Sequence, residues 1–211
     1  MNLISTLETK PLSARVKLLE AARDVIRAQG YSATSVDDLC RAAGVTKGAF
    51  FHHFASKEAL GVAAADYWSE TTAALFASAP YHDLLDPLAR ILAYIDFRSD
   101  LLVGPVETFT CLVGTMVQES FATSDPIRAA CESSISGHAA TLEADIAAAI
   151  LLYGLRGTTP ASLALHTQAV LQGAFILAKA KGDAEIARES AAHLKRYFEL
   201  LFKKGETSCP K

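Results

Sequence analysis

Residues 35–54 read SVDDLCRAAGVTKGAFFHHF, and this stretch predicts two short helices joined by a tight turn. Ser35, followed by Asp38 three residues later, is the pattern of a capping box that starts the first helix. Gly44 ends that helix at a position suited to a left-handed backbone, and Thr46 starts the second helix. The spacing is that of a helix-turn-helix, whose second helix enters the major groove of DNA.

The start of the second helix combines small residues with basic ones. Gly48 and Ala49 would let the helix backbone sit deep in a groove, while Lys47 and His52 could reach bases or phosphates. Lys57, at the start of the following helix, would form a phosphate clamp with that helix's free N–H groups. A glycine between two short helices also occurs in many helical bundles, so DNA binding needs support from the rest of the chain.

Charge is unevenly distributed along the 211 residues. The formal net charge is −3. Residues 1–61 carry eight Lys and Arg against six Asp and Glu, whereas residues 62–211 carry twelve against seventeen. Since the N-terminal segment is the cationic part of the sequence, we expect a DNA partner to dock there.

The remainder of the sequence also has the pattern of helices. Apolar–polar alternation typical of strands is nearly absent. The pairs Asp86-Pro87, Asp125-Pro126 and Thr159-Pro160 each place an N-cap residue before a proline, which starts a helix. The sequence therefore predicts an all-α fold of nine helices. The six expected after residue 55 span roughly 56–76, 87–98, 106–121, 126–153, 160–180 and 184–203.

Several other classes of protein are disfavoured. The four cysteines are Cys40, Cys111, Cys131 and Cys209. Their wide spacing predicts neither a disulfide framework nor a metal site. The longest uncharged stretch, residues 157–178, is too polar for a convincing membrane span, and residues 1–15 lack the apolar core of a signal peptide. No nucleophile–base set or pair of carboxylates stands out. We therefore expect a cytoplasmic protein, not an enzyme, with no cofactor and no membrane partner.

Residues 13–60 closely resemble the N-terminal DNA-binding domain of TetR-family transcriptional regulators. The matching residues are Gly30-Tyr31, Thr34-Ser35-Val36, Leu39, Ala42-Ala43-Gly44-Val45-Thr46, Gly48, Phe50, His53-Phe54 and Ser56-Lys57-Glu58-x-Leu60. The resemblance implies an all-α homodimer. Its helix-turn-helix head would span residues 1–55, and residues 56–211 would form a ligand-binding and dimerisation body, with the first body helix as the connector.

The resemblance, together with the helix geometry, assigns ten candidate DNA-binding residues. They are Thr34, Ser35, Thr46, Lys47, Gly48, Ala49, Phe51, His52, His53 and Lys57. Two positions depart from the family pattern. Phe51 stands where the family usually has tyrosine, so a hydroxyl-to-phosphate bond is missing, and His52 is the candidate to compensate. Cys40 stands where alanine is usual, and we interpret it as a small core residue.

The body carries a weaker resemblance. Residues 111–119, followed by Asp125-Pro126-x-Arg128, are similar to a subgroup with a Cys-Leu-x-Gly-x-x-x-x-Glu helix, and residues 172–179 resemble its penultimate helix. Since those regulators respond to varied small molecules, the ligand does not carry over. The candidate pocket residues are Trp68, Phe97, Phe109, Cys111, Met116 and His138. Each could instead be ordinary core, and Cys111 is either a sensor of electrophiles or oxidants or an inert thiol.

The last two expected helices are candidates for the dimer interface. The proposed interface residues are Leu163, Val170, Gly173, Leu177, Leu194, Phe198 and Leu201. Two such helices from each subunit would form a four-helix contact. Packing within one chain is the alternative for each of them.

The leading hypothesis is a homodimeric repressor that binds double-stranded operator DNA and is released by an unknown small-molecule effector. An activator, or a regulator whose ligand is a corepressor, remains an alternative. A helical enzyme or scaffold that keeps the head as a relic is a third. The sequence identifies neither the operator, nor the regulated genes, nor the effector.

Overall fold

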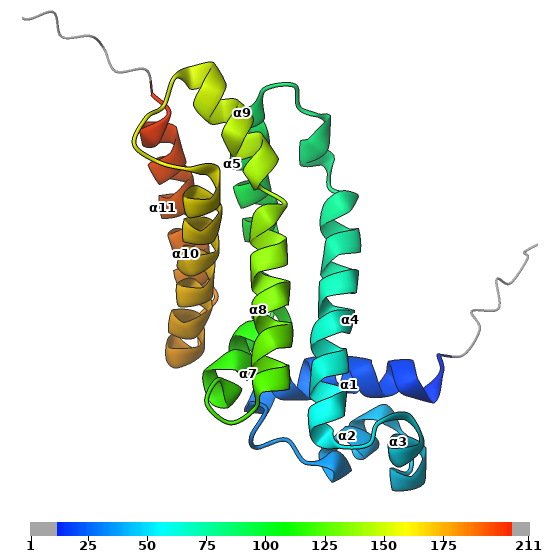
Figure 1. Cartoon of the computed structure of the whole chain (residues 1–211). Coiled ribbons are helices and arrows are strands. Elements are labelled where there is room, and N and C mark those ends of the chain that lie inside the picture. The colour runs from blue at the N-terminus through cyan, green and yellow to red at the C-terminus, as the bar shows by residue number, and fades with distance from the viewer. Residues whose placement is uncertain (1–11, 204–211) are drawn as a thin grey trace, which may run out of the picture.

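The computed structural model describes residues 12–203, which form eleven α-helices and one short 3-10 helix, with no strand within that range (Figure 1). The predicted all-α class is confirmed. Three helices make up the head at one end of the molecule: α1 (Ala14–Gln29), α2 (Val36–Ala43) and α3 (Lys47–His53).

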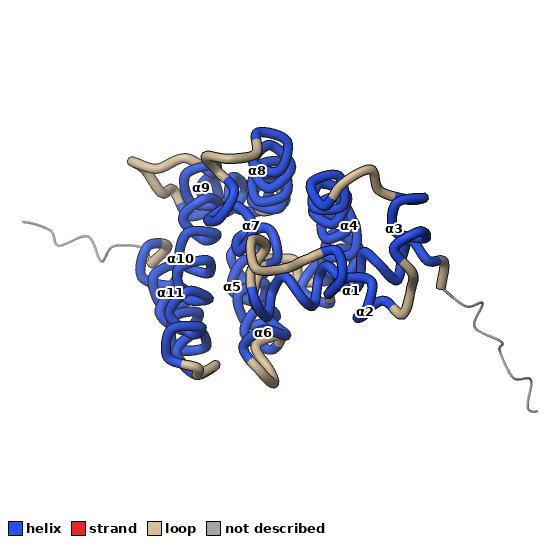
Figure 2. The backbone as a smooth tube through the Cα atoms, turned by 90° about the horizontal axis from the view of Figure 1, so that it is seen from below, coloured by secondary structure: helices blue, strands red, loops and turns tan. Residues whose placement is uncertain are grey.

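The body is a bundle of longer helices. It contains α4 (Lys57–Ala77), η1 (Pro80–Asp83), α5 (Pro87–Asp100), α6 (Val106–Phe109), α7 (Leu112–Ser120), α8 (Asp125–Ala140), α9 (Glu143–Tyr153), α10 (Pro160–Lys181) and α11 (Glu185–Leu201). Helix α4 rises from the head and packs along α8, while α10 and α11 pack together on the flank far from α2 and α3 (Figures 1 and 2).

The local signals around the turn of the head are confirmed. The backbone N–H of Asp38 donates to Ser35 Oγ at 3.1 Å, and Asp38 Oδ2 accepts from the Ser35 N–H at 3.0 Å, so the capping box is complete. Gly44 has a left-handed backbone with φ of 63°. Thr46 Oγ1 accepts from the Ala49 N–H at 3.1 Å and starts α3. These short-range bonds fix the angle between α2 and α3.

The described residues form two more α-helices than the nine expected, because two expected helices are each interrupted. The stretch 126–153 divides at Thr141 and Leu142, whose N–H groups bond three residues back, to His138 and Ala139, and tighten the turn. The stretch 106–121 divides at Cys111, which has an extended backbone and becomes the N-cap of α7. Its Sγ accepts from the Gly114 N–H at 3.4 Å.

The apolar core of the head continues into the body. Leu39 and Phe50 of the head belong to the same buried cluster as Leu60 of α4, Met116 of α7 and Ile127 of α8. The expected boundary between residues 55 and 56 falls just before the N-cap of α4, within this continuous core. The division into two domains therefore stays a prediction, and any movement of the head must shift packed side chains.

Two stretches are long and apolar enough, by length and composition, to cross a membrane. They are residues 125–153 and helix α10, each with a mean hydropathy of 1.3. The first is interrupted between α8 and α9, and α10 packs against α8, α9 and α11. Core helices of soluble proteins pass the same test, so this is weak evidence for a membrane span.

Candidate nucleic-acid interface and ligand cavities

The N-terminal part of helix α3 is exposed to solvent and includes two small residues. Lys47 and Gly48 are exposed, Ala49 is half-buried, and Phe50 is fully buried and anchors the helix on the head's core. A Cβ placed on Gly48 would meet only the hydroxyl of Thr46, at 3.7 Å. An exposed helix N-terminus with small side chains is the shape that a major groove admits.

Lys47 is the exposed cation of this surface. Its Nζ lies 2.8 Å from Asp37 Oδ1, and both side chains are more than half exposed. The hydrogen bond to Asp37 raises the pKa of Lys47, so the ammonium stays charged. An exposed pair of this kind is weak, so a phosphate can replace the carboxylate as the partner of Lys47.

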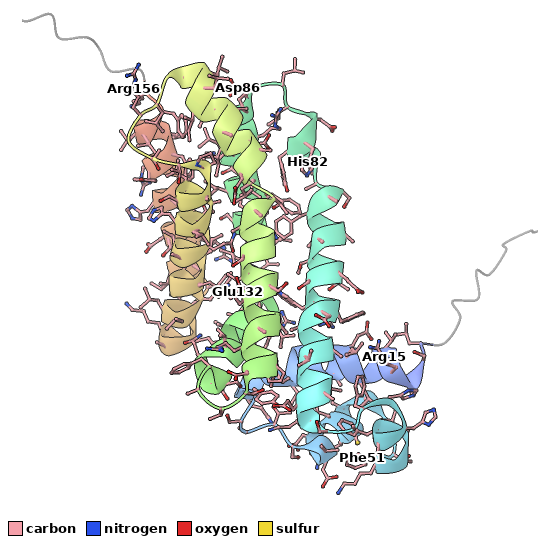
Figure 3. The ribbon with its side chains drawn as sticks, in the orientation of Figure 1. Arg15, Phe51, His82, Asp86, Glu132 and Arg156 are labelled. Carbon is pink, nitrogen blue, oxygen red and sulfur yellow. The ribbon has the colours of Figure 1, made fainter. Side chains whose placement is uncertain are left out.

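Three aromatic rings follow along α3. Phe51 is 55% exposed and lies at the end of the head remote from the body (Figure 3). His52 is exposed and His53 is half-buried, with their ring centroids 4.8 Å apart. Phe51 lacks the hydroxyl that could bond a phosphate, but its apolar ring can contact a thymine methyl or a sugar.

Three predicted DNA-contacting side chains, those of Thr34, Ser35 and Lys57, are already engaged within the protein. Thr34 is 1% exposed and its Oγ1 donates to Gly30 O at 2.6 Å, so the hydroxyl faces the protein. Lys57 Nζ donates to Tyr31 O at 3.0 Å and to Thr34 O at 2.9 Å, and lies 4.4 Å from the Tyr31 ring centroid. The ammonium of Lys57 braces the turn before α2 instead of standing free. Ser35 is exposed, but its hydroxyl is engaged with Asp38.

The body contains a large cavity of about 650 Å³ between α4, α5, α8 and α9. Its lining is rich in polar groups, including Asp66, Glu70, Arg90 and Asp145. Arg90 donates from Nε to Asp145 Oδ1 at 2.8 Å, so the cation of this cavity is already paired. Of the predicted pocket residues, His138 lines this cavity.

A second cavity of about 210 Å³ lies nearer the head. Four predicted pocket residues line it: Trp68, Phe109, Cys111 and His138. Thr72, Phe76 and Ser134 line both cavities, as His138 does, so the two share a wall. Arg27 and Arg98 also line the smaller cavity, although neither was predicted from the sequence. The available signal for Arg98 was its place on the apolar stripe of α5, seven residues after Ile91 and four after Tyr94.

The shared wall contains a buried hydrogen-bonded chain. Gln168 Nε2 donates to the Tyr94 hydroxyl at 3.4 Å, and that hydroxyl lies 2.9 Å from His138 Nε2. Burial, with a smaller contribution from the charge of Arg98, lowers the pKa of His138 to about 4. Because His138 is then neutral at pH 7, the network assigns Nε2 as the acceptor of the Tyr94 proton.

Two predicted pocket residues do not line either cavity. Met116 is fully buried in the core that joins α7 to the head. Phe97 is half-buried and packs edge-to-face on Phe76, with centroids 5.4 Å apart. Both are reassigned to packing, since neither side chain lines either of the two cavities.

The predicted interface residues divide between the inside and the outside of the chain. Three of them, Leu163, Leu194 and Phe198, are buried within the subunit and are corrected to internal packing. Val170, Gly173 and Leu201 are half-buried, and Leu177 is 52% exposed. Four further apolar residues of α10 and α11, not among the predicted interface residues, are exposed: Leu165, Ile176, Tyr197 and Leu200.

The head is fastened to the body by polar contacts on either side of the α1 C-terminus. Arg27 Nη1 donates to Thr108 O at 2.7 Å, and its guanidinium lies 5.5 Å from the Trp68 ring centroid. Glu119 Oε2 of α7 accepts from the Ser32 N–H at 2.7 Å. Gly30 is required beside it, because its φ is +91° and a Cβ would collide with the Glu119 carboxylate.

The head is a helix-turn-helix with an exposed recognition helix, α3, and it is attached to a helical body that contains cavities. This combination is typical of a DNA-binding transcriptional regulator. Residues 18–64 match the family model of bacterial regulatory proteins of the tetR family, and residues 87–193 match that of the C-terminal domain of LmrA/YxaF-like transcriptional regulators. The chain belongs to the TetR family. Members of this family are regulators, and the chain is not an enzyme.

Two curated relatives are similar to part of this chain. The transcriptional regulator AcuR of Cereibacter sphaeroides is 32% identical over 117 residues, which are 56% of this chain and 53% of that protein. The repressor DhaR of a Mycobacterium species is 31% identical over 114 residues, 54% of this chain and 56% of that protein. The chain therefore spans about half the length of these relatives. The crystal structure of a TetR-family regulator from Agrobacterium tumefaciens has the same fold, with a TM-score of 0.77 and 22% identity over 89% of this chain and 98% of that one.

Proposed function

We propose that the protein is a homodimeric, cytoplasmic repressor that leaves its operator when a small molecule occupies the body. The observation that supports this proposal is that Arg27 connects the head with a cavity of the body. This residue belongs to α1 of the head, yet it lines the smaller cavity and bonds to the backbone of α6 at Thr108. A ligand in that cavity would therefore contact the head directly.

The proposed DNA-contacting surface is the exposed side of α3 and its flanks. Its members are Thr46, Lys47, Gly48, Ala49, Phe51, His52 and His53. In a dimer, two such surfaces would have to lie roughly 34–36 Å apart to enter successive major grooves. That requirement makes operator binding sensitive to small rotations of the head.

The proposed dimer contact is the exposed apolar side of α10 and α11. Leu165, Ile176 and Leu177 of α10 and Tyr197 and Leu200 of α11 are large apolar side chains that the single chain leaves exposed. A Cβ at Gly173, between them on α10, would meet nothing within 4 Å. An apolar stripe on two adjacent helices is suited to the self-complementary contact of a two-fold dimer.

The mechanism follows from the contacts of Arg27 and from the position of α4. Helix α4 begins directly after α3, and its Trp68 lies against the Arg27 guanidinium in the wall of the smaller cavity. Occupation of the cavity would shift α4 and α1 together and change the separation of the two heads. Since linkage is reciprocal, operator DNA must weaken ligand binding by the same factor.

Capture of genomic fragments by the purified protein, followed by a reporter driven by the captured promoter, tests this function. In cells that lack the gene, we expect reporter expression to rise, because a repressor has been removed. A fall in expression would identify an activator. Failure to retain any specific fragment at moderate salt would refute DNA binding by the head.

A further inference from the structure

The two cavities of the body carry opposite charge. The larger is lined by the carboxylates of Asp66, Glu70 and Asp145 and by one arginine, Arg90, which is paired with Asp145. The smaller is lined by two arginines and, among the described residues, by no Asp or Glu. A negatively charged ligand would therefore be repelled from the larger cavity and attracted to the smaller one.

The two arginines of the smaller cavity are not equivalent. Arg27 is neutralised, because its Nη2 lies 2.9 Å from Asp24 Oδ1 and its other donors reach backbone carbonyls. Arg98 is half-buried, and within residues 12–203 it forms neither an ion pair nor a hydrogen bond. Its guanidinium carbon lies 5.4 Å from the Phe76 ring centroid and 5.8 Å from that of Phe175.

The aromatic rings account for only part of what a guanidinium requires. Ring faces attract its charge, but they offer no acceptor to its five in-plane N–H donors. For the part of the guanidinium that burial removes from water, an ionic partner and hydrogen bonds offset the cost of desolvation. The rings thus hold Arg98 in place in the cavity wall, and its N–H groups are left to bond a planar, bidentate anion such as a carboxylate.

A neutral donor lies in the same wall. The side-chain amide of Gln172 on α10 lines the cavity and forms no hydrogen bond with any residue of the described chain. Gly114 makes room for this amide, because a Cβ at that position would collide with Gln172 Oε1. A donor from α5 and one from α10 are therefore both available to a single ligand.

We propose that the smaller cavity is a binding site for a small monocarboxylic acid. The carboxylate binds Arg98 and accepts a further hydrogen bond from Gln172, and the short apolar part of the ligand packs against Trp68, Phe109 and Phe175. The volume of about 210 Å³ limits the ligand to a compact acid. For its effect on DNA, though not for binding itself, this inference rests on the proposed ligand response.

Calorimetric titration of the full-length protein tests the site. The probes are the straight-chain monocarboxylates from acetate to octanoate, and benzoate with its neutral and cationic counterparts benzamide and benzylamine. We expect at least one carboxylate to bind once per chain, and benzamide and benzylamine to bind about 10- to 100-fold more weakly than benzoate, as for the loss of a charged hydrogen bond.

Variants separate the role of Arg98 from general charge. Arg98→Gln should lose the carboxylate preference, and Arg98→Lys should recover part of it, because lysine keeps the charge without the bidentate geometry. The control Arg156→Gln removes an exposed arginine at the end of the body remote from the head (Figure 3) and should bind as the parent does. If Arg98→Gln does not fold, Gln172→Leu supplies an independent loss of carboxylate affinity.

Failure of this site and failure of the proposed function give different results. No carboxylate binding at millimolar concentrations, or equal binding by Arg98→Gln, would overturn the site even if a neutral or cationic compound released operator DNA. Carboxylate binding that depends on Arg98 but leaves the captured DNA fragments bound would support the site and refute the proposed release mechanism.

Discussion

Replacement of Gly173 by leucine should stabilise the folded subunit and yet abolish the dimer. Gly173 lies in the interior of α10, where glycine is about 1 kcal/mol less favourable than alanine. A Cβ there meets nothing within 4 Å in the same chain, so a side chain can be added without a clash. If a second subunit covers this position, the same side chain wedges the two subunits apart.

The substitution should raise the stability of the subunit slightly and lower the affinity for operator strongly. Within the subunit, Gly173→Leu should raise the free energy of unfolding by about 0.5–1 kcal/mol, since leucine is nearly as good a helix former as alanine. Loss of the dimer removes the effective concentration with which the second head binds after the first. That loss should weaken operator binding by a factor of about 10²–10⁴, or roughly 2.7–5.5 kcal/mol.

Sedimentation velocity, circular dichroism and operator titration measure these effects separately. We expect monomeric sedimentation, unchanged helix content and loss of operator binding to appear together. Gly137→Leu is the control for sedimentation and helix content, because Gly137 also lies in a helix interior with nothing within 4 Å, on α8 instead of α10. Since Gly137 lines the larger cavity, this control is not used for operator binding. A Gly173→Leu variant that stays dimeric and binds operator like the parent would remove Gly173 from the interface.

Three further predictions concern the head and the cavities. Lys47→Ala should lower the slope of log affinity for operator against log salt by about one, with no loss of stability, whereas Lys57→Ala should lower the thermal midpoint because it frees the Tyr31 and Thr34 carbonyls. Cys111→Ser should keep operator binding, and it should abolish release by thiol-reactive compounds only if Cys111 is a sensor; equal release from parent and variant would leave Cys111 as a packing residue. The pKa of His138 is lowered to about 4 from about 6.5 in an unfolded chain, so protons bind the unfolded state first as the pH falls below 6.5. The contribution of His138 to the protein's free energy of unfolding should therefore fall by about 2 kcal/mol between pH 7 and pH 5 and level off below pH 4. In equilibrium denaturation, His138→Gln should lose this pH dependence of stability. Equal pH dependence in the parent and the variant would contradict the assignment.

Signals that act over three or four residues were sufficient to predict the head. The capping box of Ser35 and Asp38 and the left-handed Gly44 need no distant partner, so the sequence predicts them directly. The side chain of Lys57, in contrast, bonds to the backbone carbonyl of Thr34, more than twenty residues away, and the local pattern does not show such a contact.

The body was harder to predict because several of its helices are apolar on more than one side. On α10, Leu163 is buried and Leu165 is exposed, although both are leucines two residues apart. Hydrophobic periodicity separates the inside from the outside only when the outside is polar. Arg98 is a different case, because its position on the buried stripe of α5 was visible in the sequence but its lack of an ionic partner was not.

The position of Arg27 determines which parts of such a regulator can change during evolution without loss of its ligand response. Among the described residues that line the two cavities, Arg27 alone belongs to the head. Substitutions in α4 to α10 can therefore change the preferred ligand without changing the operator that the recognition helix, α3, binds. An exchanged head, in contrast, must bring an arginine that fits the Thr108 carbonyl and a turn that accepts Glu119. On the proposed mechanism, a hybrid must match this junction, as well as the apolar core that continues from the head into the body, to keep its ligand response.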